Sequence, residues 1–392
     1  MTTRRYRPAA RMAAIEPFHV MDLLARARKL EAAGQDIVHM EIGEPDFPTP
    51  DTAIKAAHIA LARGKTTYTP ATGLPALREE ISAFYSRQYA VDIDPARIVV
   101  TPGSSGALLL LMSALVNSGD KVLLADPGYP CNRHFVEQVN GVPVAVPVNG
   151  STRFQLNAAL VEAHWDTQTR AVVVASPSNP CGTCVSSDEM TSIHQVVVER
   201  GGDMIVDEIY QQLVYDAKPR SILQHTDDVF VVNSFSKYFC MTGWRLGWVV
   251  APEAYVRDLD KLAQNLFLAA STPAQYAALA VLGDEALVGL EQQRDQFRQR
   301  RDYLLPALRD LGFDLLVEPE GAFYLYADCS KFTDDSMAFT LDLLRNAGVA
   351  ITPGIDFGSH RASEHVRFAY TTDIDRLRQG VQRLSRYLDG LG

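Results

Sequence analysis

Short runs of β-branched and aliphatic residues recur along the middle of the chain. They show too little alternation of apolar and polar positions for strands with one wet face, so we expect strands buried on both faces of a sheet. Longer segments with helical character separate several of these runs, and this repetition predicts an α/β fold with crossover connections. The seven predicted strands of this mainly parallel sheet are Arg97–Thr101, Lys121–Ala125, Val142–Val148, Arg170–Ser176, Asp203–Asp207, Val229–Asn233 and Gly247–Ala251.

The C-terminal quarter of the chain has a different pattern. A long charged helix is predicted over Leu287–Leu311, and its polar character on most faces indicates that it bridges two domains. The elements predicted after it are strands at Gly321–Tyr326, Val349–Thr352 and Val366–Tyr370 and helices at Ser336–Ala347 and Ile374–Leu388. The segment before about Gly43 is expected to be helical and to pack on this part. We therefore predict a large domain over residues 46–286, and a smaller α+β domain from residues 1–45 and 287–392.

Composition narrows the class of protein. The 392 residues are 47% hydrophobic and 21% charged, which is ordinary for a globular protein and excludes a disordered chain. The formal net charge of -10 argues against nucleic acid as a partner, because an acidic surface repels phosphate backbones. Five cysteines, sparse and odd in number, do not form a disulfide framework. Cys181 and Cys184 lack the second pair or nearby histidine of a zinc site, so no metal is expected.

Two segments bear on where the protein acts. The N-terminus is positively charged but lacks the apolar run of a signal peptide. Ala107–Val116 is the most apolar stretch, but it is interrupted by Ser113 and is about half as long as a membrane span. We expect a buried helix there, no membrane association, and a cytoplasmic location.

Several candidate functional residues follow the predicted strands, where ligands bind in α/β sheets. Gly103–Gly106 begins a helix with small residues, and the free backbone N–H groups of such a turn favour an anion. The turn matches neither glycine-rich nucleotide pattern. Asp207 ends a buried strand, where a carboxylate needs a hydrogen-bond donor or a cation. Lys237 follows another strand, where a lowered pKa would make its amine a good Schiff-base nucleophile.

Three more residues follow strands in the same way. Tyr129 offers an aromatic face, Asn179 offers an amide from a Pro/Gly turn, and Arg245 lies eight residues after Lys237. Each also has an ordinary interpretation as a core tyrosine, a turn asparagine or a surface cation. Together the anion-binding turn, aromatic face, amide, carboxylate, lysine and arginine fit a flat cationic ring with a phosphate and an aldehyde. Pyridoxal 5′-phosphate is such a molecule.

Ordered motifs over nearly the whole chain add a family resemblance. They are Gly43-Glu44-Pro45-Asp46-Phe47, Tyr68 to Arg78, Ser178-Asn179-Pro180 before Gly182-Thr183, Asp207-Glu208-Ile209-Tyr210, Ser234-Phe235-Ser236-Lys237 with Arg245, Gly321-Ala322-Phe323-Tyr324 and Val366-Arg367-Phe368. In this order they resemble the class I/II pyridoxal-phosphate-dependent aminotransferases of fold type I, in the bacterial aspartate, alanine and aromatic-type subgroup. The resemblance implies transfer of an amino group from an L-amino acid to a 2-oxo acid in a ping-pong cycle.

The resemblance also implies roles in cofactor binding and catalysis. Lys237 would form the Schiff base and move the α-proton, and Asp207 would keep the ring nitrogen protonated. Tyr210 and Asn179 would hydrogen-bond the phenolic oxygen of the ring, on which Tyr129 would stack. The residues implied to hold the phosphate are Ser104, Ser105, Ser234 and Arg245, with Ser236 assisting and Tyr68 reaching it from a second subunit.

The substrate would be held by its α-carboxylate. The resemblance implies a bidentate pair with Arg367, assisted by the Gly43 backbone and Asn179. Aspartate-specific relatives often carry a lysine in the phosphate-binding loop, where this chain has Gly103–Gly106, so the case for aspartate is weaker. Alanine, aromatic, branched-chain and glutamate donors all remain compatible.

Two other functions are known for proteins with this type of fold. A pyridoxal-phosphate-dependent carbon–sulfur β-lyase would use the same lysine, aspartate and arginine, and it remains the alternative. A DNA-binding regulator with an aminotransferase-like domain is not expected, because the residues before Gly43 are too few for a DNA-binding head. The implied action of Tyr68 across an interface predicts a homodimer.

Overall fold

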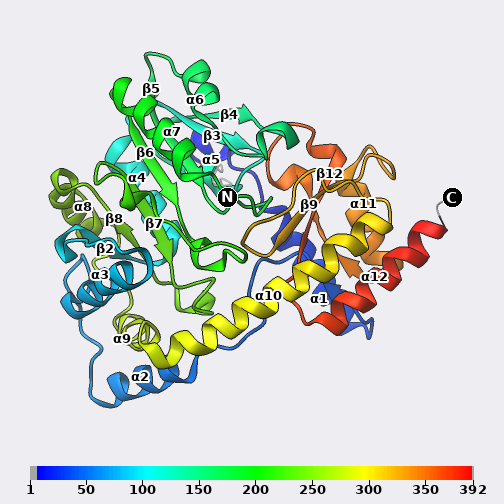
Figure 1. The fold of residues 1–392 in the computed structure, drawn as a ribbon, viewed down its shortest axis with the longest axis horizontal. Helices are drawn as coiled ribbons and strands as arrows, with labels where there is room; N and C mark the ends of the chain where they lie inside the picture. Colours follow the sequence, from blue (N-terminus) through cyan, green and yellow to red (C-terminus); the bar gives the residue numbers. More distant parts are fainter. Residues whose placement is uncertain (1–6, 391–392) are drawn as a thin grey trace, which may run out of the picture.

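The computed structural model describes residues 7–390 and contains the predicted seven-stranded α/β sheet. Its strand order is β2-β8-β7-β6-β5-β3-β4, and β8 runs antiparallel to both of its neighbours while the other pairs are parallel (Figure 1). The strands are β2 (Ile98–Thr101), β3 (Lys121–Asp126), β4 (Val142–Pro147), β5 (Thr169–Ala175), β6 (Asp203–Asp207), β7 (Phe230–Ser234) and β8 (Gly247–Val250).

Helices cover both faces of this sheet. One apolar core lies between the sheet and α4 (Gly103–Leu115), α5 (Cys131–Gln138) and α8 (Glu253–Leu266). The core on the other face includes α3 (Pro75–Tyr89), α6 (Ala158–His164), α7 (Ser187–Glu199) and α9 (Thr272–Val281), and α2 (Asp51–Ala62) packs on α9. The central strands are therefore buried on both sides, which explains their continuous apolar runs.

Strand β4 is the exception among the seven. It lies at the edge of the sheet, and most of its residues are exposed or half-buried, with Val142 at 42%. Pro143 and Pro147 have no backbone N–H to donate to a neighbouring strand. They therefore fit an edge strand, which has a neighbour on one side only. The expectation that this strand is buried on both faces was therefore wrong.

A second, smaller sheet lies beside the first and is built from the C-terminal part of the chain. Its order is β11-β12-β9, all antiparallel, with β9 at Tyr324–Asp328, β11 at Thr352–Pro353 and β12 at His365–Ala369. Helix α11 (Ser336–Asp342), which a π-turn extends to Ala347, and α12 (Ile374–Asp389) accompany it. These elements lie close to the predicted ones.

The N-terminal segment packs on this smaller sheet, with two differences from the prediction. It contains the helix α1 (His19–Ala32) but also the strand β1 (Val38–His39). The predicted strand Val349–Thr352 divides into β10 (Val349–Ala350), which pairs in parallel with β1, and β11, which pairs with β12. Only tertiary pairing separates these two short strands.

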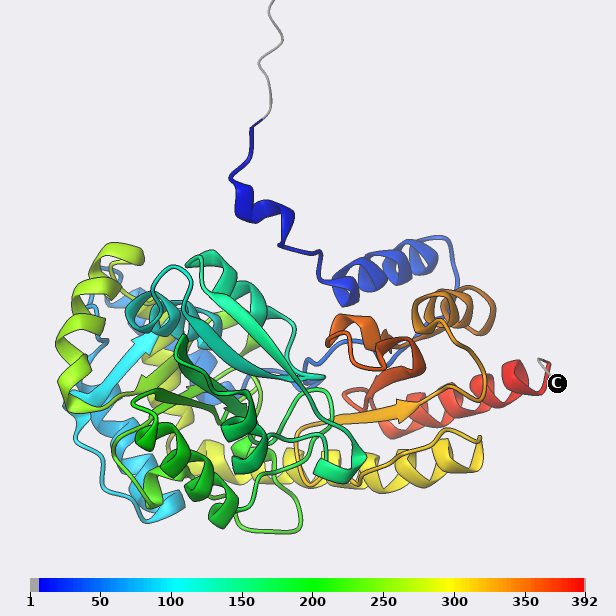
Figure 2. The same cartoon turned by 90° about the horizontal axis from the view of Figure 1, so that it is seen from above.

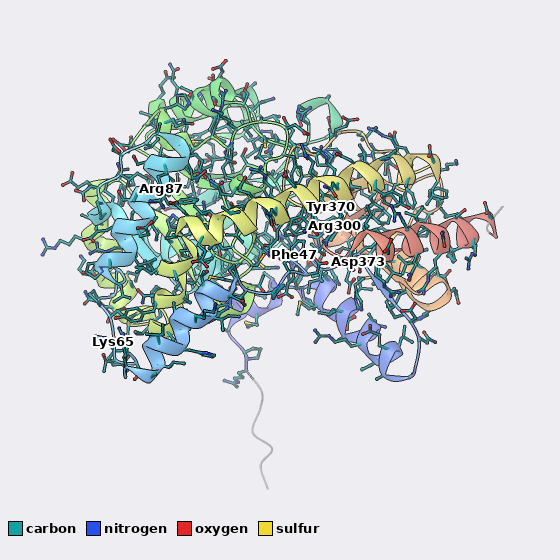
Figure 3. All side chains as sticks on the ribbon, turned by 60° about the horizontal axis from the view of Figure 1, so that its bottom comes forward. Phe47, Lys65, Arg87, Arg300, Tyr370 and Asp373 are labelled. Carbon is teal, nitrogen blue, oxygen red and sulfur yellow. The ribbon has the colours of Figure 1, made fainter. Side chains whose placement is uncertain are left out.

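Helix α10 (Asp284–Asp310) runs alongside both sheets and corresponds to the predicted long helix (Figures 1 and 2). It is less uniformly polar than expected, because a narrow stripe that includes Leu290, Phe297 and Leu304 is buried. Near its middle, both Arg300 Nη atoms donate to the Asp46 carboxylate at 2.7 and 2.9 Å, and the guanidinium lies 4.9 Å from the Phe47 ring (Figure 3).

Residues 7–390 bear on the predictions about membrane association and metal binding. In that range no helix combines the length and apolar character needed to cross a membrane. No group of three or more histidine, cysteine, aspartate or glutamate side chains in the same range could hold a metal ion. The Ala107–Val116 stretch is part of the buried helix α4, and all five cysteines are free.

Candidate active site

A cavity of about 200 Å³ lies between the two sheets, where β5, β6 and β7 end. Ten of the residues predicted from the sequence line it: Gly43, Ser104, Ser105, Tyr129, Asn179, Asp207, Tyr210, Lys237, Arg245 and Arg367. Ser236, expected to assist, lines it as well. The cavity also has a side that was not predicted, formed by Phe18, Val20, Met21, Ile42 and Tyr324.

Lys237 is placed by the turn that follows β7. Its Nζ donates a hydrogen bond to the Gly43 carbonyl oxygen at 2.7 Å. Burial lowers the pKa of this amine to about 8, and the nearby Arg367 and Arg245 charges act in the same direction. An appreciable fraction is therefore neutral near pH 7 to 8, which is the form that attacks carbonyl carbon or accepts a proton.

Asp207 is the last residue of β6 and faces the same cavity. Its Oδ1 accepts a hydrogen bond from the Ile209 N–H at 3.1 Å. Burial raises the pKa of this carboxyl to about 6, although the Ile209 N–H and the Lys237 charge oppose the shift. A buried carboxylate with so few donors is stabilised by a cation, and a protonated ring nitrogen would supply one.

Small residues and Arg245 form an anion-binding corner at the start of α4. The N-cap residue of α4, Pro102, provides no side-chain cap, so the first N–H groups of the helix are available to an anion. Gly103 has a φ of +76°, and a Cβ there would lie 2.7 Å from Arg245 Nη2. Arg245 Nη1 donates to the Thr242 carbonyl oxygen at 3.0 Å. The corner therefore combines a helix N-terminus with a cation.

Arg367 projects from β12 and is held on every side. Its Nη1 donates to Asn179 Oδ1 at 2.9 Å, and its Nη2 donates to the Glu41 carbonyl oxygen at 2.5 Å. The guanidinium lies between the rings of Tyr324 and Phe357, at 4.2 and 4.8 Å from their centroids. Its Nε donates to no atom of residues 7–390. A planar cation fixed in this way is suited to a carboxylate.

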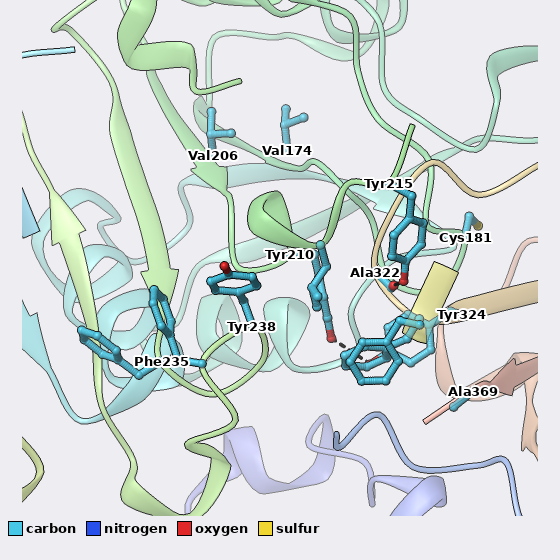
Figure 4. Packing of buried hydrophobic residues seen from close by; sticks show 14 of the residues in the cluster. Val174, Cys181, Val206, Tyr210, Tyr215, Phe235, Tyr238, Ala322, Tyr324 and Ala369 are labelled. Atoms are coloured by element: carbon cyan, nitrogen blue, oxygen red, sulfur yellow. Dashed lines mark hydrogen bonds between the residues drawn. The ribbon is translucent and has the colours of Figure 1, made fainter. Parts of the chain in front are cut away.

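Tyr324 is a site residue that the sequence reasoning missed. Its hydroxyl lies 2.8 Å from the Tyr210 hydroxyl, and the two rings meet edge to face (Figure 4). The hydroxyl also lies against the Cα of Gly43, where a Cβ would overlap it. The only sequence feature that points to Tyr324 is its place in the Gly321–Tyr324 motif, and that motif alone does not indicate a function for it.

Replacing Gly43 by alanine is expected to lower kcat/KM by about 100-fold, because the new methyl group must displace Tyr324 and with it the Tyr210 hydroxyl. The free energy of unfolding should fall by about 1–3 kcal/mol, as for other overpacked sites. Steady-state kinetics and denaturant unfolding measure the two effects. Gly289→Ala is the matched control, since a Cβ there meets no atom within 4 Å. Full activity of Gly43→Ala would contradict this account.

Two predicted residues lie apart from the cavity. Ser234 is buried behind Ser236, and its Oγ donates to Ser236 Oγ at 2.9 Å and to the Leu246 carbonyl oxygen at 3.1 Å. Tyr68 is 82% exposed and does not line the cavity of its own chain. The phosphate contacts expected of both residues stay predictions.

Comparison with known proteins agrees with this geometry. The sequence model of the family "Aminotransferase class I and II" matches residues 35–384. The chain is 37% identical to the valine–pyruvate aminotransferase of Mycobacterium tuberculosis, over 96% of this chain and 97% of that protein. It is 36% identical to a probable aspartate/prephenate aminotransferase of Aquifex aeolicus, over 97% and 98%.

Solved structures extend the agreement to the fold. The crystal structure of an aminotransferase from Mycobacterium tuberculosis superposes with a TM-score of 0.95, at 37% identity, over 98% of this chain and 100% of that one. The chain therefore belongs to the class I and II aminotransferases, pyridoxal-phosphate-dependent enzymes that transfer an amino group between amino acids and 2-oxo acids.

Proposed function

We propose that the cavity around Lys237 is the active site and that the enzyme prefers amino donors with apolar side chains. The observation that carries the site is the convergence of a buried lysine, a buried carboxylate and a fixed arginine on one cavity. Burial explains both shifted pKa values, and strongly perturbed groups that share a cavity are typical of catalytic sites.

The residues present fit pyridoxal phosphate. When bound, this cofactor supplies the carbonyl carbon that takes up the amino group and a ring that withdraws electrons from the reacting carbon. Asp207 would bind the ring nitrogen and satisfy its own charge. The α4 N-terminus with Ser104, Ser105 and Arg245 would hold the phosphate. The half-buried Tyr129 ring forms part of the cavity wall and would stack on the cofactor.

Proton movement is assigned to Lys237. Its neutral Nζ would act as a base and remove the α-proton of the substrate, and the resulting ammonium group would act as an acid and deliver the proton to the cofactor carbon that takes up the amino group. Its hydrogen bond to the Gly43 carbonyl oxygen supports this role, because Gly43 is one of the residues proposed to bind the substrate. Arg367 would bind the α-carboxylate, and the Tyr210 hydroxyl and Asn179 would hydrogen-bond the ring oxygen.

The preference for apolar donors follows from the cavity lining. Among the described residues that line it, the cations are Lys237, Arg245 and Arg367, and each has a role in the cofactor or the α-carboxylate. The side formed by Phe18, Val20, Met21 and Ile42 is apolar. A second carboxylate would find no cation there, whereas an aliphatic or aromatic side chain would be desolvated at low cost. The name of the valine–pyruvate relative agrees with this preference, whereas the name of the aspartate/prephenate relative does not, so the proposal rests on the cavity lining.

We further propose a cytoplasmic homodimer with the domain boundaries predicted above. The 82% exposure of Tyr68 is compatible with the dimer, because this side chain is accessible to a second subunit, as the family resemblance implies. The separate sheets support a large domain over 46–286 and a small domain over 1–45 and 287–392, of which residues 1–6 and 391–392 lie outside the described part of the chain.

A half-reaction tests the site and the donor class together. Single amino acids are added to the purified holoenzyme without a 2-oxo acid, and the visible absorbance of the cofactor is followed. We expect conversion to the pyridoxamine form with one 2-oxo acid per site, faster for leucine, valine or phenylalanine than for aspartate. Product formed over many turnovers with the original absorbance restored would instead indicate a β-lyase, and aspartate as the fastest donor would contradict the apolar preference.

A further inference from the structure

The first turn of α1 forms the apolar side of the cavity although it comes from the far N-terminal part of the chain. Phe18 precedes the helix, and Val20 and Met21 lie in its first turn; all three line the cavity. Val20 is 3% exposed, whereas Met21 is 52% exposed. The position of this turn therefore determines the shape of the wall that an apolar side chain would meet.

The first turn of α1 has no capping side chain of its own. Its N-cap residue is Phe18, which cannot accept a hydrogen bond. The missing cap is supplied by Asp356, more than 330 residues away: Oδ1 accepts from the His19 N–H at 2.9 Å, and Oδ2 accepts from the Val20 N–H at 3.1 Å. A carboxylate that binds two N–H groups at a helix N-terminus is favoured by both hydrogen bonding and the helix dipole.

Asp356 connects this turn to the substrate-binding arginine. It follows β11, in which Thr352 is paired with Arg367 of β12. The Asp356 side chain is 1% exposed, and burial raises the pKa of its carboxyl while the two α1 N–H groups and the Arg367 charge oppose the shift. One short turn therefore fixes the start of α1 relative to the carboxylate-binding group.

One other polar contact lies near the start of α1: Arg133 Nη2 is 3.4 Å from the carboxylate of Glu16, which is exposed. The chain before α1 leaves the body of the protein, and its 3-10 turn at Ala10–Ala13 contains no buried residue (Figure 2). The rest of α1 packs through Leu23 and Ala27 on a small apolar cluster, one turn and more away from Phe18. The two hydrogen bonds to Asp356 are therefore the polar anchor of the cavity-lining turn.

We propose that Asp356 is a positioning residue for substrate selection: by capping α1 from the other end of the chain, it holds Phe18 and Met21 where they contact the side chain of the amino donor. The inference rests on the proposed function, since it assumes that an apolar donor occupies this side of the cavity. Asp356 itself contacts neither the reacting atoms nor the cofactor.

The test compares Asp356→Asn with Asp373→Asn in the holoenzyme. Asp373 also accepts two backbone N–H groups in the first turn of a helix, α12, with both distances at 3.0 Å, but it is exposed and no residue of α12 lines the cavity (Figure 3). The readout is kcat/KM for leucine divided by kcat/KM for alanine. Alanine has a single methyl group, so its rate depends less on the apolar wall.

We expect Asp356→Asn to lower this ratio about tenfold, the size of effect that apolar pocket contacts produce. Asp373→Asn should leave the ratio unchanged even where it lowers the midpoint of thermal unfolding. An equal loss for both donors, or no loss for either, would overturn the proposal.

Met21→Ala tests the same proposal without touching the cap. Because Met21 is half-exposed, this variant should fold, and it should also lower the ratio. An unchanged ratio in Met21→Ala would overturn the proposal even if Asp356→Asn failed to fold. Failure of the proposed function gives a different result, since the wild-type enzyme would then convert neither leucine nor alanine.

Discussion

Replacing Lys237 by alanine is expected to lower the rate of transamination by about 10⁴-fold, the upper end of what a positioned acid–base group contributes. Its amine is the group in the cavity that can both attack a carbonyl carbon and carry a proton at neutral pH, because burial lowers its pKa to about 8. Cofactor binding should survive in part, since Asp207, Arg245 and the α4 N-terminus do not depend on Lys237. Single-turnover kinetics and the cofactor absorbance measure the two properties separately.

The matched control for Lys237 is an exposed lysine. Lys261 is paired with Asp258 on the surface of α8, and its replacement by alanine should change neither turnover nor absorbance. Normal turnover of Lys237→Ala would contradict the proposal that the cavity around Lys237 is the active site. A small quantity of activity restored by added methylamine would support it, because a free amine can then accept the proton in place of Nζ.

Replacing Arg367 by leucine is expected to reduce kcat/KM by roughly a hundredfold for amino donors and 2-oxo acids alike. Loss of a buried, hydrogen-bonded charge pair costs about 3 kcal/mol, and both substrates carry the carboxylate that Arg367 would bind. Arg367→Lys should recover only part of the loss, because an ammonium group lacks the planar pair of donors. Separate determination of kcat and KM for one donor and one acceptor is the measurement.

Two controls separate binding from folding in that experiment. Arg378 lies on the exposed surface of α12 and pairs with Asp375, so Arg378→Leu should leave KM unchanged. The cofactor absorbance of Arg367→Leu should match that of the wild-type enzyme if the fold is intact. A KM that rises for the donor alone would show that Arg367 does not bind the shared carboxylate.

The large sheet could be predicted from the sequence because its central strands are buried on both faces, which produces continuous apolar runs. The prediction erred where local pattern and tertiary environment differ. Strand β4 has an apolar sequence but lies at the edge of the sheet. The two strands β10 and β11 have two residues each, too few for any periodicity, and β10 pairs with β1 from the other end of the chain.

The candidate site likewise contains residues that the sequence could select and residues that it could not. Lys237, Asp207 and Asn179 follow strands, and the rule that ligands bind at the carboxyl ends of strands is enough to select them. Tyr324 and Asp356 act through residues that are distant in sequence, on Gly43 and on the start of α1. The motif that contains Tyr324 assigns it no contact, and no local pattern marks Asp356, so only the folded chain reveals what these two residues touch.

The pairing of β1 with β10 has a consequence for how the protein is made. Val38 and Val349 are neighbours in the fold, so the two-stranded sheet of β1 and β10 cannot form until nearly the whole chain has left the ribosome. The strands of the large sheet, from Ile98 to Val250, become available much earlier. During synthesis the side of the cavity proposed to bind the cofactor can therefore form first, and the side proposed to bind the substrate, with Arg367 and the α1 turn that Asp356 caps, is completed last.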